Sequence, residues 1–120
     1  MKVAISANSE KIDEKIADVF GRCPFFIVAE IENDEIKNTR TIKNDNAVQT
    51  GGAGISSAQL IAENDIQALI TKNVGPRAMD VLNQFNIKVY SGEGTAKDLL
   101  DRFIKKELTE ITNETGHTNQ

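Results

Sequence analysis

The stretch FFIVAEIENDEIKNTRTI, residues 25–42, determines the directions in which the strands of this chain run. Its first part, residues 25–31, is rich in aromatic and β-branched side chains, which are typical of a buried strand. Asn33 and Asp34 then form a turn, and residues 35–42 alternate between apolar and polar side chains, as a half-exposed strand does. The stretch therefore predicts a hairpin whose two strands run antiparallel.

Apolar runs and helical spacing on either side of this hairpin predict an α/β fold. Further strands are expected at residues 2–7, 66–71 and 87–90. Helices are expected at about 55–64, 76–85 and 95–104, with a short helix or turn at 9–19. Strands that alternate with helices form parallel, right-handed crossovers, whereas the hairpin adds one antiparallel strand. We therefore expect a mixed sheet of about five strands with helices on both faces.

Length and composition indicate one acidic domain. The 120 residues suit a single domain, which we place at residues 1–106, followed by a polar, flexible tail at residues 107–120. The formal net charge of −4 argues against a nucleic-acid-binding surface. No apolar segment resembles a signal peptide or a membrane span. We therefore expect a cytoplasmic protein that binds neither nucleic acid nor membranes.

The predicted strand directions bring several polar segments to one edge of the sheet. If strand 25–31 is the antiparallel one, the other strands end together, and ligands of open α/β sheets bind outside such ends. Helices start at the same edge, where their free N–H groups attract anions. The reversed strand begins there as well, so Arg22 and Cys23 are expected beside the crevice. The sequence therefore predicts an anion-binding crevice at this edge.

Glycines and basic side chains are further candidates at this crevice. The TGGAG loop opens a helix, and Gly52, Gly54 and Gly75 allow a ligand to approach the backbone closely. The loop has neither a Walker motif nor a G-x-G-x-x-G motif, so its glycines are also consistent with a tight loop and nothing more. Lys72 and Arg77 are placed to neutralise an anion, although surface charges are commonly only solvated.

Cys23, the only cysteine, is either a metal ligand or a small packed residue. A structural zinc site needs four ligands, and the only histidine, His117, lies in the tail. A single thiolate suits an iron cluster that brings its own sulfides, and Arg22 would favour that thiolate. Buried cysteines are common too. The domain offers no histidine base for a nucleophile, and its first strand has no aspartate for a metal-dependent nuclease, so we expect no enzymatic activity.

Four motifs, in chain order, resemble a known family. They are FGRCPFF (20–26), GGAGISSAQLI (51–61), NVGPRAMDVL (73–82) and NIKVYSGEGTAKDLL (86–100). Together they are similar to the dinitrogenase iron-molybdenum cofactor biosynthesis family of NifX, NafY and the C-terminal domain of NifB, and the sequence looks like a small stand-alone member. The resemblance implies a three-layer α/β/α sandwich with a ribonuclease H-like mixed sheet. It also implies a carrier of the iron-molybdenum cofactor or its iron–sulfur precursor that is not a catalyst.

The resemblance also implies a site. Several family members carry histidines in or near the Gly-rich loop, whereas residues 50–54 have none, so Cys23 is the remaining soft ligand. We expect Cys23 as the metal ligand of an iron–sulfur or iron–molybdenum-type cluster, and no nucleotide cofactor. The expected cluster pocket consists of Arg22, Cys23, Gly52, Gly54, Lys72, Gly75 and Arg77.

The expected partners are the cluster or its precursor and cluster-assembly proteins. The chain itself is expected to be a monomer or a weak homodimer. Two other functions fit the same residues. One is a small-anion or nucleotide-binding regulatory module that uses the helix N-termini. The other is an interaction scaffold that pairs between chains through the sheet edge at residues 35–42.

Overall fold

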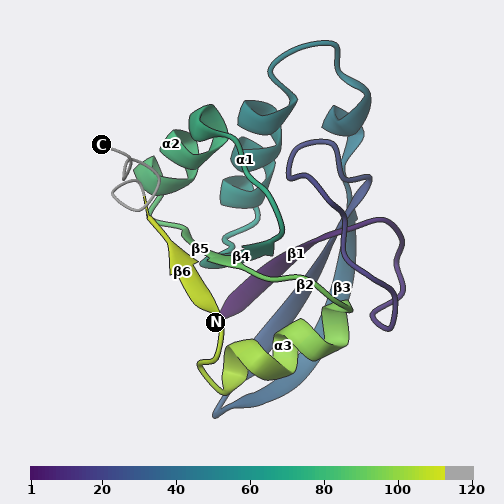
Figure 1. Ribbon diagram of the computed structural model, residues 1–120, viewed down its shortest axis with the longest axis vertical. Helices are drawn as coiled ribbons and strands as arrows, with labels where there is room; N and C mark the ends of the chain where they lie inside the picture. The colour runs from purple at the N-terminus through teal and green to yellow at the C-terminus, as the bar shows by residue number, and fades with distance from the viewer. Residues whose placement is uncertain (113–120) are drawn as a thin grey trace.

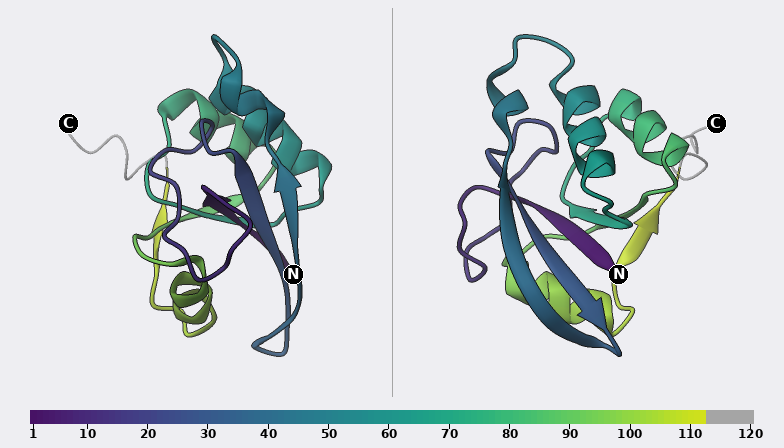
Figure 2. Two further views of the ribbon diagram at one scale, coloured as in Figure 1. Left: turned by 90° about the vertical axis from the view of Figure 1, so that its right-hand side faces the viewer. Right: turned by 180° about the vertical axis from the view of Figure 1, so that it is seen from behind.

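The computed structural model describes residues 1–112 as a mixed sheet covered by helices on both faces (Figure 1). The strands, in the spatial order β3-β2-β1-β4-β5-β6, are β1 (Lys2–Ala7), β2 (Phe25–Glu32), β3 (Glu35–Lys43), β4 (Ala68–Thr71), β5 (Lys88–Ser91) and β6 (Thr109–Ile111). The helices are α1 (Ala53–Glu63), α2 (Pro76–Gln84) and α3 (Ala96–Ile104), with a short 3-10 helix, η1 (Asp45–Val48). Because α1 and α2 cover one face and α3 the other (Figure 2), the three-layer α/β/α prediction is confirmed.

The directions of the strands follow the prediction from the hairpin. β2 runs antiparallel to both β1 and β3, whereas β1, β4 and β5 are parallel to one another. Asn33 (φ 53°) and Asp34 (φ 63°) make the turn with a left-handed backbone, which these two residue types tolerate. β1, β3, β4 and β5 therefore end at the same edge of the sheet, and α1, α2 and α3 begin at that edge.

Alternate side chains of the strands pack against opposite helical layers. Ala4, Phe26 and Leu69 join the cluster under α1 and α2, whereas Val3 and Ile5 join the cluster under α3. Successive side chains of a strand point to opposite faces, so both faces of the central strands are buried. This is why the central strands read as continuous apolar runs in the sequence.

One strand lies where the sequence predicted a flexible tail. β6 pairs antiparallel with β5, so the sheet formed by the described residues has six strands, of which β2 and β6 run against β1. Leu108 and Ile111 are the only apolar residues after position 106, too few to indicate a strand. In the fold, Ile111 packs against the cluster under α1 and α2. Residues 113–120, which include His117, lie outside the described residues.

The segment 9–19, predicted to be a short helix or a turn, forms turns. Its backbone N–H groups bond to neighbouring segments: Ile16 N donates to Gly94 O (2.9 Å) and Ala17 N to Ser6 O (2.9 Å). Just beyond, Phe20 N donates to Asn73 O (2.8 Å). These bonds hold the segment against the edge of the sheet up to the start of β2.

Candidate functional site

A pocket of about 460 Å³ opens at the edge where the helices begin. Three segments line it: residues 19–22 before β2, residues 52–55 at the start of α1, and residues 75–78 at the start of α2. We call the first of these the 19–22 turn. The pocket therefore combines the start of the reversed strand with two helix N-termini.

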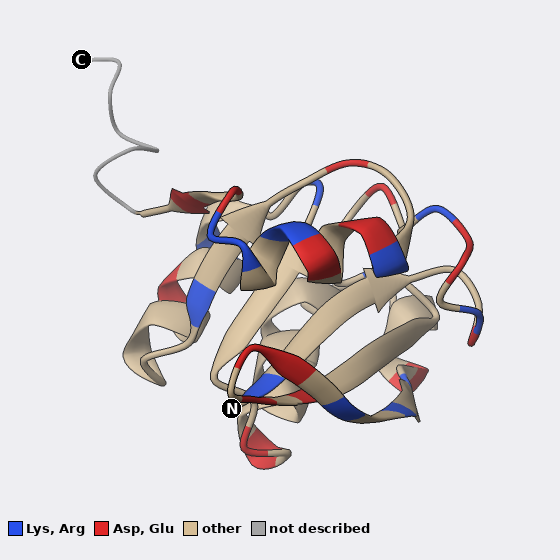
Figure 3. Ribbon diagram, turned by 90° about the horizontal axis from the view of Figure 1, so that it is seen from below, with Lys and Arg blue, Asp and Glu red and all other residues tan. Residues whose placement is uncertain are grey.

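The helices α1 and α2 begin without a side-chain cap, unlike α3. Their N-cap residues, Gly52 and Gly75, have no side chain that accepts a hydrogen bond, and neither first turn contains an acidic residue. At α3, Thr95 Oγ1 accepts a hydrogen bond from Asp98 N (3.1 Å), and the helix carries charges of both signs (Figure 3). The free N–H groups and positive dipole ends of α1 and α2 therefore meet at the pocket.

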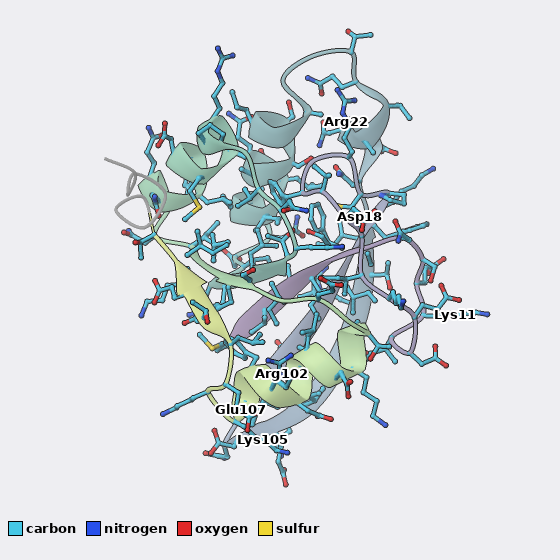
Figure 4. All side chains as sticks on the ribbon, in the orientation of Figure 1. Lys11, Asp18, Arg22, Arg102, Lys105 and Glu107 are labelled. Carbon is cyan, nitrogen blue, oxygen red and sulfur yellow. The ribbon has the colours of Figure 1, made fainter. Side chains whose placement is uncertain are left out.

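Among the described residues, two arginines and no acidic residue line the pocket. Arg77, in the first turn of α2, is exposed and makes no hydrogen bond or ion pair with the described residues. A cation at a helix N-terminus opposes the helix dipole, so the stability of α2 does not explain its position. Arg22 donates from Nη1 to the carbonyl oxygens of Ala47 (3.1 Å) and Gln49, beside the loop that leads to α1 (Figure 4). Its other N–H groups are available to an anion.

A second hollow, of about 530 Å³, lies at the opposite ends of the same two helices. Its lining includes Glu30, Asp65 and Lys2, with Phe85 directly after α2. Helix C-termini carry a negative partial charge, to which the two carboxylates add. Even with the positive charge of Lys2, this hollow is less positive than the pocket at the helix starts, which is therefore the better candidate for an anion.

The walls of the pocket touch through two glycines. Gly21 has φ +98°, and a Cβ on it would lie 2.9 Å from Gly54 Cα. A Cβ on Gly54 would in turn lie 3.2 Å from the Cβ of Ala78. Glycine at these positions lets the 19–22 turn, α1 and α2 approach one another. Gly21 is a site residue that the sequence did not reveal, because a lone glycine gives no sign of a contact with a distant segment.

The thiol of Cys23 does not line the pocket. Its side chain is 1% exposed and belongs to the cluster under α1 and α2, with Phe20 and Phe26. Burial raises the pKa of the Cys23 thiol, although hydrogen bonds from the Gly21 backbone and the Ser6 side chain act in the opposite direction. Of the arginine–cysteine pair expected beside the crevice, the structure brings only Arg22 to the pocket.

We expect the buried thiol to make stability fall at alkaline pH. The pKa of Cys23 is higher in the folded than in the unfolded state, so its contribution is complete below the unfolded pKa and is lost as pH rises through the folded pKa. The stability advantage of the wild type over Cys23→Ala should shrink above about pH 9, by roughly 1 kcal/mol per pH unit. Urea unfolding of both proteins between pH 7 and pH 10 measures this difference, and a constant difference would contradict the burial argument.

The remaining candidate, Lys72, lies outside the pocket lining. Its Nζ forms ion pairs with Asp18 (3.4 Å) and Glu93 (3.8 Å), which neutralise its charge. The structure thus gathers five of the seven expected residues around one pocket: Arg22, Gly52, Gly54, Gly75 and Arg77.

The described residues offer no preformed metal centre. Within residues 1–112, no group of three or more His, Cys, Asp or Glu side chains is arranged to hold a metal ion. The part of the pocket lining that residues 1–112 supply contains no cysteine, histidine or methionine. A metal-containing ligand would therefore be held there by hydrogen bonds and charge.

None of the described helices is long and apolar enough to cross a membrane.

Comparisons with known proteins point to one family. The family model described as "Dinitrogenase iron-molybdenum cofactor" matches residues 1–106. The uncharacterized protein MJ0580 of Methanocaldococcus jannaschii is 39% identical over 98 residues, covering 82% of this chain and 80% of that protein.

Solved structures agree over nearly the whole chain. The apo form of the orange protein from Desulfovibrio gigas superposes with a TM-score of 0.85 at 27% identity, covering 92% of each chain. A putative NifB protein from Thermotoga superposes with a TM-score of 0.79 at 28% identity, covering 99% of this chain and 97% of that one.

Proposed function

The chain belongs to the dinitrogenase iron-molybdenum cofactor family, and from this premise we propose that it is a non-enzymatic carrier of an anionic metal–sulfur cluster. The cluster is of iron–sulfur or iron–molybdenum type, or a precursor of one. The proposal rests on one observation: two uncapped helix N-termini and two arginines converge on a pocket whose described lining has no acidic residue. Donors of this kind bind anions, and charged donors bind them most strongly.

The mode of binding follows from the residues that are absent from the lining. With no soft side chain among the described residues of the pocket, the cluster supplies its own sulfides, and the protein holds it from outside through N–H groups of the backbone and of Arg22 and Arg77. Cys23 can ligate a metal only if the chain around it opens, because the thiol is buried and bonds to the Gly21 backbone of the 19–22 turn.

A small-anion or nucleotide-binding regulatory module remains a second candidate. The observation that favours it is the same lack of soft ligands, since hard N–H donors suit the oxygens of a phosphate as well as sulfides. The two candidates differ in what they retain: a carrier keeps iron and sulfide, whereas a regulatory module is stabilised by phosphate alone.

An interaction scaffold through β3 is disfavoured by the shape and charge of that edge. The β2–β3 register shifts at Glu30 and Ile31, which marks a bulge. β3 also carries Lys37, Arg40 and Lys43. Bulges and lysines on edge strands are devices that prevent pairing with another chain.

We expect the chain, reconstituted anaerobically with ferrous iron and sulfide, to retain both through desalting and to show a visible absorption band. Cys23→Ser should retain iron to within about twofold of the wild type, because the pocket holds the cluster without the thiol. A tenfold loss in this variant would instead identify Cys23 as a ligand. Iron and sulfide analysis after desalting gives the measurement. Failure of the wild type to retain iron, combined with thermal stabilisation by inorganic phosphate, would overturn the carrier in favour of the regulatory module.

A further inference from the structure

The side chain of Asn44 connects two walls of the pocket from behind. It is 3% exposed and lies in the loop between β3 and η1. Its Nδ2 donates to the carbonyl oxygen of Cys23 (2.8 Å) and to Ser57 Oγ (3.0 Å), and lies 3.4 Å from the carbonyl oxygen of Gly21. Its Oδ1 accepts a hydrogen bond from Asn46 Nδ2 (3.2 Å). One amide group therefore connects the chain around Arg22, the residues of η1 and helix α1.

These partners flank the arginine that faces the pocket. Gly21 and Cys23 are the neighbours of Arg22 in the sequence, so Asn44 fixes the backbone on both sides of that residue. The guanidinium of Arg22 is held by the same loop, through the carbonyl oxygens of Ala47 and Gln49. The loop that begins with Asn44 thus sets both the position and the orientation of Arg22.

We propose that Asn44 is a positioning residue for the pocket: it locks the 19–22 turn against α1, which orients Arg22 toward a bound anion and keeps Cys23 closed off. An amide combines two N–H donors, for the carbonyl of Cys23 and the hydroxyl of Ser57, with an acceptor for Asn46. Ser57, which is fully buried in α1, completes the lock by bonding to Asn44 and to the Gly21 carbonyl (3.3 Å). The lock itself is independent of the ligand, while its role in binding rests on the proposed carrier function.

A merely structural asparagine would behave differently from a lock. If Asn44 were merely structural, loss of its buried hydrogen bonds would lower the global stability alone, and the Cys23 thiol would become accessible only through global unfolding. Loss of a lock opens the 19–22 turn locally and exposes Cys23 while the rest of the chain stays folded. The rate at which Cys23 reacts with a thiol reagent, compared at equal global stability, separates the two roles.

The test compares Asn44→Ala with Leu100→Val, a core change under α3 on the opposite face of the sheet. With the two variants brought to equal stability by urea, we expect Cys23 to react at least about tenfold faster in Asn44→Ala. Equal rates would overturn the lock. Asn44→Asp, which keeps the acceptor and loses the donor, should resemble Asn44→Ala. If Asn44→Ala does not fold, Ser57→Ala replaces it in the same comparison. We expect a smaller increase in the rate at which Cys23 reacts in that variant.

Retention of reconstituted iron and sulfide then tests whether the lock serves binding. We expect Asn44→Ala to retain several-fold less iron than Leu100→Val at the same stability. Equal retention in the two variants would refute the positioning role even if the thiol opens. If the wild type itself retains no iron, the carrier function fails, and the labelling rates still decide whether Asn44 locks the turn.

Discussion

Gly21→Ala is expected to destabilise the fold more than any other single change at the pocket, lowering the free energy of unfolding by about 2–5 kcal/mol. Two penalties add at this position. The backbone has φ +98°, which an alanine adopts only with strain. The new Cβ would also lie 2.9 Å from Gly54 Cα, a backbone atom that cannot move aside as the end of a side chain can. The 19–22 turn would therefore have to separate from α1.

The matched control for this change is Gly51→Ala. A Cβ at Gly51 meets nothing within 4 Å, and its backbone lies outside the positive-φ region. Replacing such a glycine restricts the unfolded chain, so a change within about 1 kcal/mol of the wild type, in either direction, is expected. Urea unfolding of the three proteins gives the comparison. Similar stabilities for Gly21→Ala and Gly51→Ala would show that the turn and α1 are not in tight contact.

The directions of the strands were accessible from the sequence because they depend on local signals. The Asn33–Asp34 turn between two apolar runs indicates a hairpin, and Pro76 and Thr95 mark the starts of α2 and α3. β6 was not accessible, since its pairing depends on β5 and on the burial of Ile111. The turns at residues 9–19 likewise depend on partners far away in the chain.

The pocket was partly accessible for the same reason. Strand direction alone brings Arg22 to the same edge as the starts of α1 and α2. The burial of Cys23 was not visible, because it depends on a core cluster whose members, Phe20 and Leu69 among them, come from different parts of the chain. Asn44 gave no signal at all: in the sequence it is one polar residue in a polar loop, and only the fold shows the carbonyl groups that it bonds.

Arg77→Glu is expected to change stability and binding in opposite directions. Arg77 lies in the first turn of α2, where a cation opposes the helix dipole and a carboxylate favours it. Without ligand, the variant should therefore be more stable than the wild type, by roughly 0.5–2 kcal/mol at low salt. The same change removes a charged donor from the pocket and adds a repelling charge, so retention of the iron–sulfide cluster should fall about 100-fold or more.

A gain in stability together with a loss of cluster retention distinguishes a binding residue from an ordinary surface charge. Arg40→Glu makes the same change in net charge on the exposed edge strand β3, away from the pocket, and should leave both stability and retention close to the wild type. Thermal unfolding at low and high salt measures the first effect, which salt should reduce, and iron analysis after anaerobic desalting measures the second. A destabilised Arg77→Glu would mean that Arg77 supports the fold, and unchanged retention would exclude it from the site. Only a variant that gains stability while losing the cluster fits an arginine placed at a helix start to bind an anion.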